Sequence, residues 1–257
     1  MISLFDFWIR RAEALVALEK PEKLTYKKSW PLQEKYLFLM ERDTAVELGG
    51  YPQESINLIA PSSRLQELTT LKDGVYCIGD QNAVSEKKKG LLSGGHSRRH
   101  VSFGKIVLLE TDDVPQEQLY EFMQSVSLLE ASFHMKDIML RQSSVQYRIN
   151  LRISTKAVKE GFSISELGWT IYETYRALAH VRSVVVILLV GEHSLYRSLE
   201  EPAEKIKELT TTLNHIFDGI DMDCGHCDLS AVCNEVEELR VLHRKQTGAE
   251  KKKEEEK

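Results

Sequence analysis

Three closely spaced cysteines are the part of the sequence best suited to chemistry. Cys224, Cys227 and Cys233 have the spacing C-x2-C-x5-C. Two thiolates separated by two residues can reach one metal ion or cluster from a single turn, and Gly225 lets the backbone bend around that centre. The third cysteine lies one or two turns into a predicted helix whose N-cap is Asp228 or Ser230, and a helix start favours a thiolate. The segment is therefore predicted to hold a metal centre.

The cysteine spacing predicts a metal centre more directly than it predicts which metal is bound. Three thiolates are one ligand short of a closed four-ligand site; the fourth can come from Cys77, His226, His215, a partner's side chain or an exogenous ligand. The spacing favours a [4Fe-4S] cluster over zinc, because zinc knuckles usually pair two C-x2-C units or one such unit with two histidines. A disulfide or free thiols are the alternatives. We expect no stable disulfide, since we recognise no secretory signal.

Composition is that of an ordinary water-soluble domain. The chain has 257 residues, 42% of them hydrophobic and 28% charged, with a net charge of -5. This length supports one substantial core or two modest ones. The negative charge argues against nucleic acid as a partner. The longest apolar run, residues 184–190, is too short to span a membrane. Because the cysteines cluster and fit a reducing compartment, we expect a cytoplasmic protein.

The hydrophobic pattern predicts a mixed α+β fold. Strands are predicted at residues 36–40, 44–48, 55–59, 74–78, 103–110, 145–153 and 184–190. Helices are predicted at residues 1–19, 112–130, 154–161, 165–180 and 194–216, the last broken or begun afresh at Pro202. A final helix is predicted from an N-cap at Asp228 or Ser230 to about residue 244. We expect one mixed β-sheet with packed helices, followed by a helical segment that carries the cysteines.

The predicted domain organisation has four parts. They are an N-terminal amphipathic helix (1–30), a central α/β domain (31–217), a cysteine-rich metal-binding segment (218–247) and a charged, disordered tail (248–257). The N-terminal helix is expected to pack within its own chain, because most apolar stripes are core.

Several local features carry their own expectations. Asp73 with Gly74 predicts a hairpin turn, and Asp112 or Asp113 is expected to cap the helix that follows. Cys77 is expected to be a small buried residue rather than a ligand. The loop from Lys87 to His100 is glycine-rich and basic; we expect it to be solvated, with phosphate or acidic-partner binding as the alternative.

A predicted strand also carries two arginines on its polar face. Arg148 and Arg152 alternate with the apolar residues of 145–153, so they point away from the predicted core. They can bind an anion or meet water, and solvation is the default expectation.

Two short motifs are similar to a known family. Residues 46–50 read V-E-L-G-G, and residues 151–162 read L-R-I-S-T-K-A-V-K-E-G-F. They resemble V-E-M-G-G and L-R-V-S-K-D-A-V-A-K-G-F in the central domain of the β subunit of the carbon monoxide dehydrogenase/acetyl-CoA synthase complex. Residues 179–186 are similar to the stretch that enters the last strand of that domain. The resemblance covers roughly residues 36–233.

The resemblance implies a function for the cysteines. In the family, a linking helix leads from this domain to the cysteines of the nickel-iron-sulfur A-cluster; Cys224 and Cys227 fall at that place, and Cys233 lies close to it. This chain departs from the family in its shorter second spacing and in lacking the fourth cysteine. It also lacks the Cys-Gly-Cys nickel chelate and the N-terminal domain that meets the dehydrogenase. The expected protein is a truncated relative.

The expected role is that of an iron-sulfur subunit or accessory protein. It would transfer electrons or dock a protein partner in a corrinoid-linked complex of anaerobic one-carbon or carbon monoxide metabolism. One alternative is a catalytic subunit of the acetyl-CoA synthase type, which joins a methyl group, CO and coenzyme A at a nickel-iron-sulfur centre. The other alternative is a zinc-stabilised adaptor.

Overall fold

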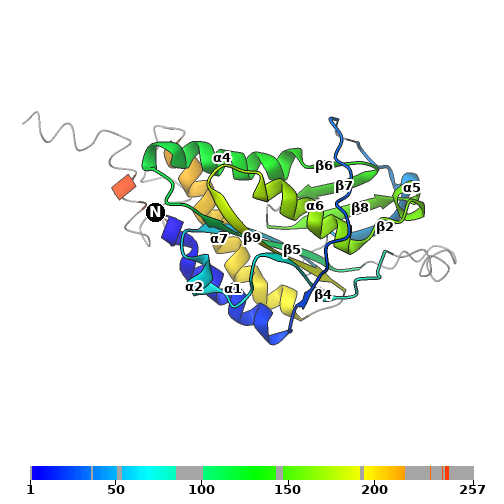
Figure 1. Cartoon of the computed structure of the whole chain (residues 1–257), viewed down its shortest axis with the longest axis horizontal. Coiled ribbons are helices and arrows are strands. Elements are labelled where there is room, and N and C mark those ends of the chain that lie inside the picture. The colour runs from blue at the N-terminus through cyan, green and yellow to red at the C-terminus, as the bar shows by residue number, and fades with distance from the viewer. Residues whose placement is uncertain are drawn as a thin grey trace, which may run out of the picture.

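The chain folds into two β-sheets with helices on both sides (Figure 1). The computed structural model describes residues 2–35, 37–50, 54–84, 101–142, 147–191 and 194–217, together with Val232, Leu239, Val241 and Leu242. The helices are η1 (Ile2–Phe5), α1 (Asp6–Leu18), η2 (Glu41–Asp43), α2 (Leu65–Leu68), α4 (Gln116–Ser132), α5 (Thr155–Lys159), α6 (Ile164–Arg176) and α7 (Leu195–Phe217). The predicted mixed α+β class is confirmed.

The larger sheet, sheet A, is mixed and holds the centre of the core. Its strand order is β1 (Glu22–Lys23), β4 (Gly74–Gly79), β9 (Val181–Val190), β5 (Phe103–Thr111) and β3 (Ser55–Ser62). The pairs β3–β5 and β4–β9 are parallel, whereas β5–β9 and β1–β4 are antiparallel. The two central strands are nearly continuous apolar runs because both of their faces are covered.

The smaller sheet, sheet B, is antiparallel. Its order is β2 (Thr44–Gly49), β8 (Ile149–Ser154), β7 (Ile138–Gln142) and β6 (His134–Met135). Burial alternates along β8, as expected of a strand with one face on the core. The sequence predicts a single sheet, but the strands divide between two, because pairing partners are set by tertiary contacts that the strand pattern does not encode.

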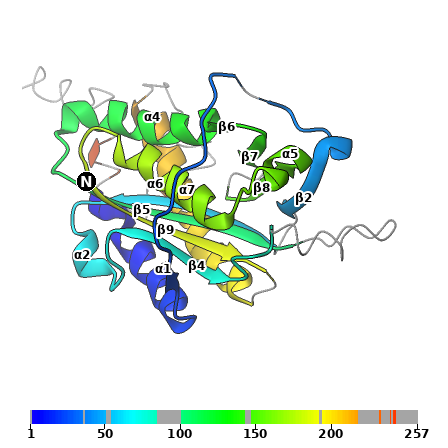
Figure 2. The same ribbon diagram turned by 45° about the vertical axis from the view of Figure 1, so that its right-hand side comes forward.

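The two faces of sheet A carry different elements (Figure 2). Helix α6 packs on β9 and β4, and α4 contacts both α6 and sheet B on the same side. The opposite face receives α1, α2 and α7. Phe5 and Ile9 of the N-terminal helical segment are buried in the common core. The expectation that this helix packs within its own chain is confirmed.

Some predicted elements differ from those observed. Residues 37–40 do not form the predicted strand; Leu39 is buried, while Phe38 and Met40 are exposed. No hairpin joins β4 to the strand before it, since the neighbours of β4 are β1 and β9. Instead, Asp73 accepts hydrogen bonds from the Val184 backbone N–H and the Tyr172 hydroxyl, each at 2.7 Å. The turn residue therefore ties α6 to sheet A.

Two helices also differ from expectation. Neither Asp112 nor Asp113 caps α4; Pro115 occupies the N-cap position, and Asp112 pairs with Arg182. Helix α7 runs through Pro202 without the predicted break. A proline inside a helix removes one backbone hydrogen bond. The long apolar face that α7 packs on α1 and β3 outweighs that loss.

An extended segment, residues 24–33, crosses α6 and connects the edges of the two sheets. We call it the strap. At one end the Leu24 N–H donates to the Val75 carbonyl of β4, and at the other the Gln33 N–H donates to the His134 carbonyl of β6. In the middle, the Trp30 indole N–H donates to the Lys136 carbonyl at 2.7 Å. The strap therefore holds sheet B against sheet A.

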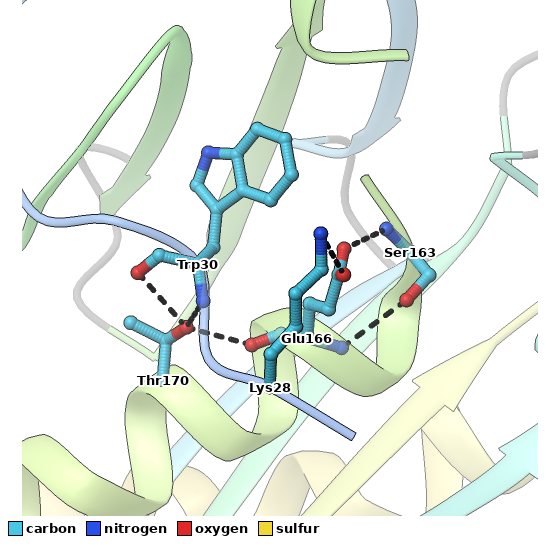
Figure 3. Close-up of polar contacts among 5 residues, drawn as sticks. All are labelled: Lys28, Trp30, Ser163, Glu166 and Thr170. Atoms are coloured by element: carbon cyan, nitrogen blue, oxygen red, sulfur yellow. Dashed lines mark hydrogen bonds and ion pairs between the residues drawn. The ribbon is translucent and has the colours of Figure 1, made fainter. Parts of the chain in front are cut away.

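The strap is fixed to the first turns of α6 by polar contacts (Figure 3). Glu166 accepts a hydrogen bond from the Ser163 N–H, while the Ser163 hydroxyl accepts from the Glu166 N–H, forming a capping box. The same carboxylate lies 3.1 Å from the Lys28 ammonium of the strap. Thr170, one turn further along, accepts from the Trp30 N–H at 2.6 Å and donates to the Glu166 carbonyl at 2.7 Å.

Replacing Thr170 with valine is expected to destabilise the fold by about 2 kcal/mol, because the buried Trp30 N–H loses its acceptor while the side-chain volume hardly changes. Thr174→Val is the matched control: its hydroxyl donates only to the Thr170 carbonyl in the same helix. We expect Thr174→Val to lower the free energy of unfolding by about 0.5 kcal/mol or less. Urea unfolding followed by circular dichroism measures both. An equal loss of unfolding free energy in the two variants would contradict the view that the hydrogen bond between Thr170 and Trp30 fixes the strap to α6.

Candidate functional site

The three cysteines predicted to bind metal lie outside the described residues. Cys224, Cys227 and Cys233 are therefore neither supported nor contradicted as ligands by the structure, and the same holds for His226 and for the loop from Lys87 to His100. Residues beside Cys233 in the sequence are described. Val232, Leu239 and Leu242 are buried in the same hydrophobic core as the two sheets. The C-terminal part of the chain is thus anchored to the domain on both sides of residues 233–238.

Cys77, one candidate for a fourth ligand, is a core residue. It lies in the middle of β4, paired in register with Leu188, and is 3% exposed. Burial raises the pKa of the Cys77 thiol to about 12, with smaller contributions from the carboxylates of Glu22 and Asp80. A protonated thiol is a poor metal ligand. The expectation that Cys77 is a small buried residue is confirmed.

His215, another candidate, lies in the last turn of α7, immediately before the cysteine segment. Its Nδ1 is buried and has no hydrogen-bond partner among the residues that the structure describes. A buried ring nitrogen without a partner is a position where a ligand bond can be made. Within the described part of the chain, no group of three or more His, Cys, Asp or Glu side chains is arranged to hold a metal ion.

The two motifs that carry the family resemblance lie side by side in sheet B. Residues 46–49 of β2 pair with residues 150–153 of β8. In this pair, Glu47 accepts hydrogen bonds from Arg152 Nε at 3.0 Å and from the Asn150 amide at 3.2 Å. Arg152 also donates to the Leu39 carbonyl at 3.1 Å. The acidic and basic residues of the motifs therefore bind each other and join β2 to β8.

The glycine that follows Leu48 in the first motif lies where the two sheets meet. Gly49 has φ +72°, and a Cβ atom there would lie 2.4 Å from the Ile149 carbonyl oxygen. It would also lie 3.3 Å from the Cβ atoms of Phe103 and Ser55, the first residues of β5 and β3. Only glycine can adopt this φ while its backbone lies so close to the Ile149 carbonyl oxygen and to the side chains of Phe103 and Ser55. Gly49 thus has a structural role that the motif alone does not reveal.

Arg148 is buried rather than solvated, so the default expectation for it was wrong. The residue is 5% exposed, and Nη1 donates to the Ser55 carbonyl at 2.7 Å. Nη2 bonds Glu200 of α7, and the guanidinium lies 4.7 Å from the Tyr147 ring centroid. The predicted strand 145–153 begins only at Ile149, so Arg148 turns into the core at the strand entrance and joins β3 to α7.

A small pocket between the two sheets is lined by both polar and apolar side chains. It encloses about 10 Å³, roughly the volume of one water-sized sphere. Its polar lining residues are Lys105 of β5, Arg141 and Gln142 of β7 and Tyr175 of α6. Its apolar lining residues are Leu129, Phe133, Leu140, Ile149 and Ile171.

Lys105 brings a buried positive charge to the lining of this pocket. It is 3% exposed in a central strand, and its Nζ lies 6.0 Å from the centroid of the Tyr175 ring, which is itself buried. The face of an aromatic ring attracts a cation and offsets part of the cost of burying it. The sequence pattern did not lead us to this site. The available signal was a lysine inside a strand whose neighbours Ile106 and Val107 are apolar.

The chain matches no protein-family model, and no curated protein matches it significantly. The relationship to acetyl-CoA synthase therefore stays a prediction. None of the described helices is both long and apolar enough to cross a membrane.

Proposed function

We propose that this protein binds a [4Fe-4S] cluster through Cys224, Cys227 and Cys233 and uses it for electron transfer or for docking a partner in anaerobic one-carbon or carbon monoxide metabolism. The observation that carries the proposal is the C-x2-C-x5-C spacing. The resemblance of residues 46–50 and 151–162 to the acetyl-CoA synthase central domain supports the metabolic setting.

The packing of the C-terminal region supports this assignment. Val232 and Leu239 are buried in the domain core on either side of Cys233 in the sequence. Cys233 therefore lies next in sequence to a residue that is fixed in the core, and a rigid support of this kind helps to hold a ligand in place. The chain's own residues would contribute thiolates, and the bound cluster would supply one-electron chemistry.

Among the candidate fourth ligands, we favour His215. Its buried Nδ1 has no hydrogen-bond partner in the described part of the chain, whereas Cys77 lies within sheet A as a thiol whose pKa is raised by burial. A histidine in place of a cysteine raises the potential of a cluster, because it removes one negative charge from the ligand set. His226, an exogenous ligand and a partner's side chain are the alternatives.

Replacing Cys227 with serine is expected to abolish the brown colour and the electron paramagnetic resonance signal of the reduced, anaerobically purified protein. A hard hydroxyl replaces a soft thiolate, and two remaining cysteines do not hold the cluster. Metal analysis of the unmodified protein should give about four irons per chain and no nickel. Cys77→Ser is the control and should keep the full absorbance, since the thiol is buried in β4.

Full absorbance in Cys227→Ser would refute the cluster assignment. Nickel together with iron would instead indicate a catalytic subunit of the acetyl-CoA synthase type. A colourless protein with one zinc ion would indicate a zinc-stabilised adaptor.

A further inference from the structure

Helices α1 and α7 lie side by side on the face of sheet A opposite α6, at the outside of the molecule (Figures 1 and 2). Together they present a set of exposed side chains that we call the α1/α7 face: Phe7, Arg11, Ala14 and Leu18 of α1, with Glu201 and Glu204 of α7. We propose that the α1/α7 face binds a second copy of the chain in a two-fold symmetric dimer. The face includes no residue of the cysteine segment, so the inference stands independently of the proposed cluster.

Helix α1 has an exposed apolar stripe opposite its buried one. Leu18 is 78% exposed and Phe7 is 66% exposed, the two highest values among the large hydrophobic residues that the structure describes. Their spacing in the sequence places them within about 20° of each other around the helix axis and about 16 Å apart along it. Ala14, between them, is exposed on the same side. Apolar side chains gathered on one exposed stripe indicate a protein contact more than scattered ones do.

The charges of the α1/α7 face suit a copy of the same face. Helix α1 exposes Arg10 and Arg11, whereas the first half of α7 exposes Glu201 and Glu204, with Arg197 one turn earlier. A two-fold interface uses one surface twice, so that surface must be complementary to itself. A basic helix beside an acidic one satisfies this requirement when α1 of each copy lies over α7 of the other.

The positions of Arg11 and Glu201 indicate how two copies fit. Arg11 Nη2 lies 3.8 Å from Glu201 Oε2, so the two residues are at the same level along their helices. Their side chains are 58% and 61% exposed, which leaves both available for a further contact. A two-fold axis along the boundary between α1 and α7, parallel to α1, keeps this level. It brings Arg11 of each copy opposite Glu201 of the other, with Phe7 and Leu18 on either side of the charge pair.

The size of the face predicts a weak dimer. Helix α1 has 13 residues and is about 20 Å long, and two adjacent helices are together about 20 Å wide. The contact area is therefore on the order of 400 Å² per copy, which is typical of weak, reversible complexes. We expect a dissociation constant on the order of 0.1 mM.

An anionic membrane surface is the other class of partner that exposed phenylalanine, leucine and arginine side chains suit. The acidic residues of the face argue against it. Glu201 and Glu204 lie beside the apolar stripe and would face the negative charge of the lipid headgroups. A second copy of the chain instead supplies arginines for these carboxylates.

Sedimentation equilibrium of the full chain, over concentrations on either side of the expected dissociation constant, tests the proposal. The mean mass should rise from the 29.5 kDa of one chain toward twice that value. Leu18→Gln should weaken the dimer about tenfold or more, because its apolar side chain no longer leaves water on association. Leu128→Gln is the matched control, since Leu128 is 62% exposed but lies on α4, on the other side of sheet A. It should leave dimerisation unchanged.

A charge exchange between two chains identifies the contact. Arg11→Glu places carboxylates opposite each other in the dimer, and Glu201→Arg places guanidinium groups there, so each variant alone should remain a monomer. An equimolar mixture of the two should form a heterodimer, because each charge then faces its opposite in the other copy. Pairing within one chain gives no such rescue, since the intramolecular pair at 11 and 201 has like charges in both variants.

The proposal fails if the unmodified chain keeps the mass of one copy throughout, or if the mixed charge variants form no heterodimer. Unchanged dimerisation of Leu18→Gln, or of either charge variant alone, would likewise overturn it by placing the contact on another face. A monomeric chain that sediments with vesicles of phosphatidylglycerol would assign the face to a membrane instead. Far-ultraviolet circular dichroism verifies that each variant is folded. None of these outcomes depends on metal at the cysteine segment, so each is distinguishable from failure of the cluster proposal.

Discussion

Gly49→Ala is expected to destabilise the protein by about 4 kcal/mol. The new methyl group would lie 2.4 Å from the Ile149 carbonyl oxygen, a backbone atom that cannot rotate away. The residue also has φ +72°, which costs an alanine about 1 kcal/mol by itself. Relief requires β2 to move from β8, or the junction with Phe103 and Ser55 to open.

A variant at a second glycine, Gly161, measures the cost of a positive φ without the steric clash that Gly49→Ala creates. Gly161 has φ +87°, but nothing lies within 4 Å of the place that an added methyl group would occupy. Gly161→Ala should therefore cost only about 1 kcal/mol. Thermal unfolding should show a fall of roughly 10 °C or more for Gly49→Ala and roughly 3 °C for Gly161→Ala. Similar shifts in the two variants would show that Gly49 is not needed for the close approach of the sheets.

Arg148→Met is expected to cost about 3 kcal/mol. The substitution removes the donor to the Ser55 carbonyl and leaves Glu200 without its guanidinium partner. Breaking one side of a buried ion pair is more damaging than replacing both partners, because a charge is left behind. The Glu200 side chain is 35% exposed, so water recovers part of the loss and keeps the expected value at the lower end of the range.

Arg152→Met provides the matched comparison within β8, the strand that Arg148 immediately precedes. Arg152 pairs with Glu47 in a quarter-exposed position, so its loss should cost about 1 kcal/mol. The double variant Arg148→Met with Glu200→Gln should recover about 1 kcal/mol relative to Arg148→Met alone, since no uncompensated charge remains. Urea unfolding of the four proteins measures these values. Equal cost for Arg148→Met and Arg152→Met would mean that burial of Arg148 contributes nothing.

Much of the secondary structure could be predicted from the sequence. The continuous β-branched run of residues 184–190 indicated a strand covered on both faces, and β9 is such a strand. Ser154 was predicted to begin a short helix, and its hydroxyl accepts from the Ala157 N–H as an N-cap. These features depend on neighbours within a few residues, so local sequence is sufficient to predict them.

The tertiary arrangement could not be predicted in the same way. Residues 37–40 have a strand-like pattern but find no partner strand, and α7 passes through Pro202 because its packing outweighs one lost hydrogen bond. The alternation of polar and apolar residues in 145–153 predicted that Arg148 faces solvent. It is buried because it binds Ser55 and Glu200, which are distant in the sequence. Each of these outcomes depends on contacts that only the folded chain creates.

The two candidate sites also differ in how far the sequence alone predicts them. The sequence by itself determined the cysteine spacing and the metal chemistry it suits, because two thiolates with two residues between them can reach one metal from a single turn. Only the tertiary structure placed Lys105 beside the ring of Tyr175 and in the lining of one pocket with Arg141, although these residues are far apart in the chain. A buried charge is defined by what surrounds it, and sheet packing rather than local sequence supplies those surroundings.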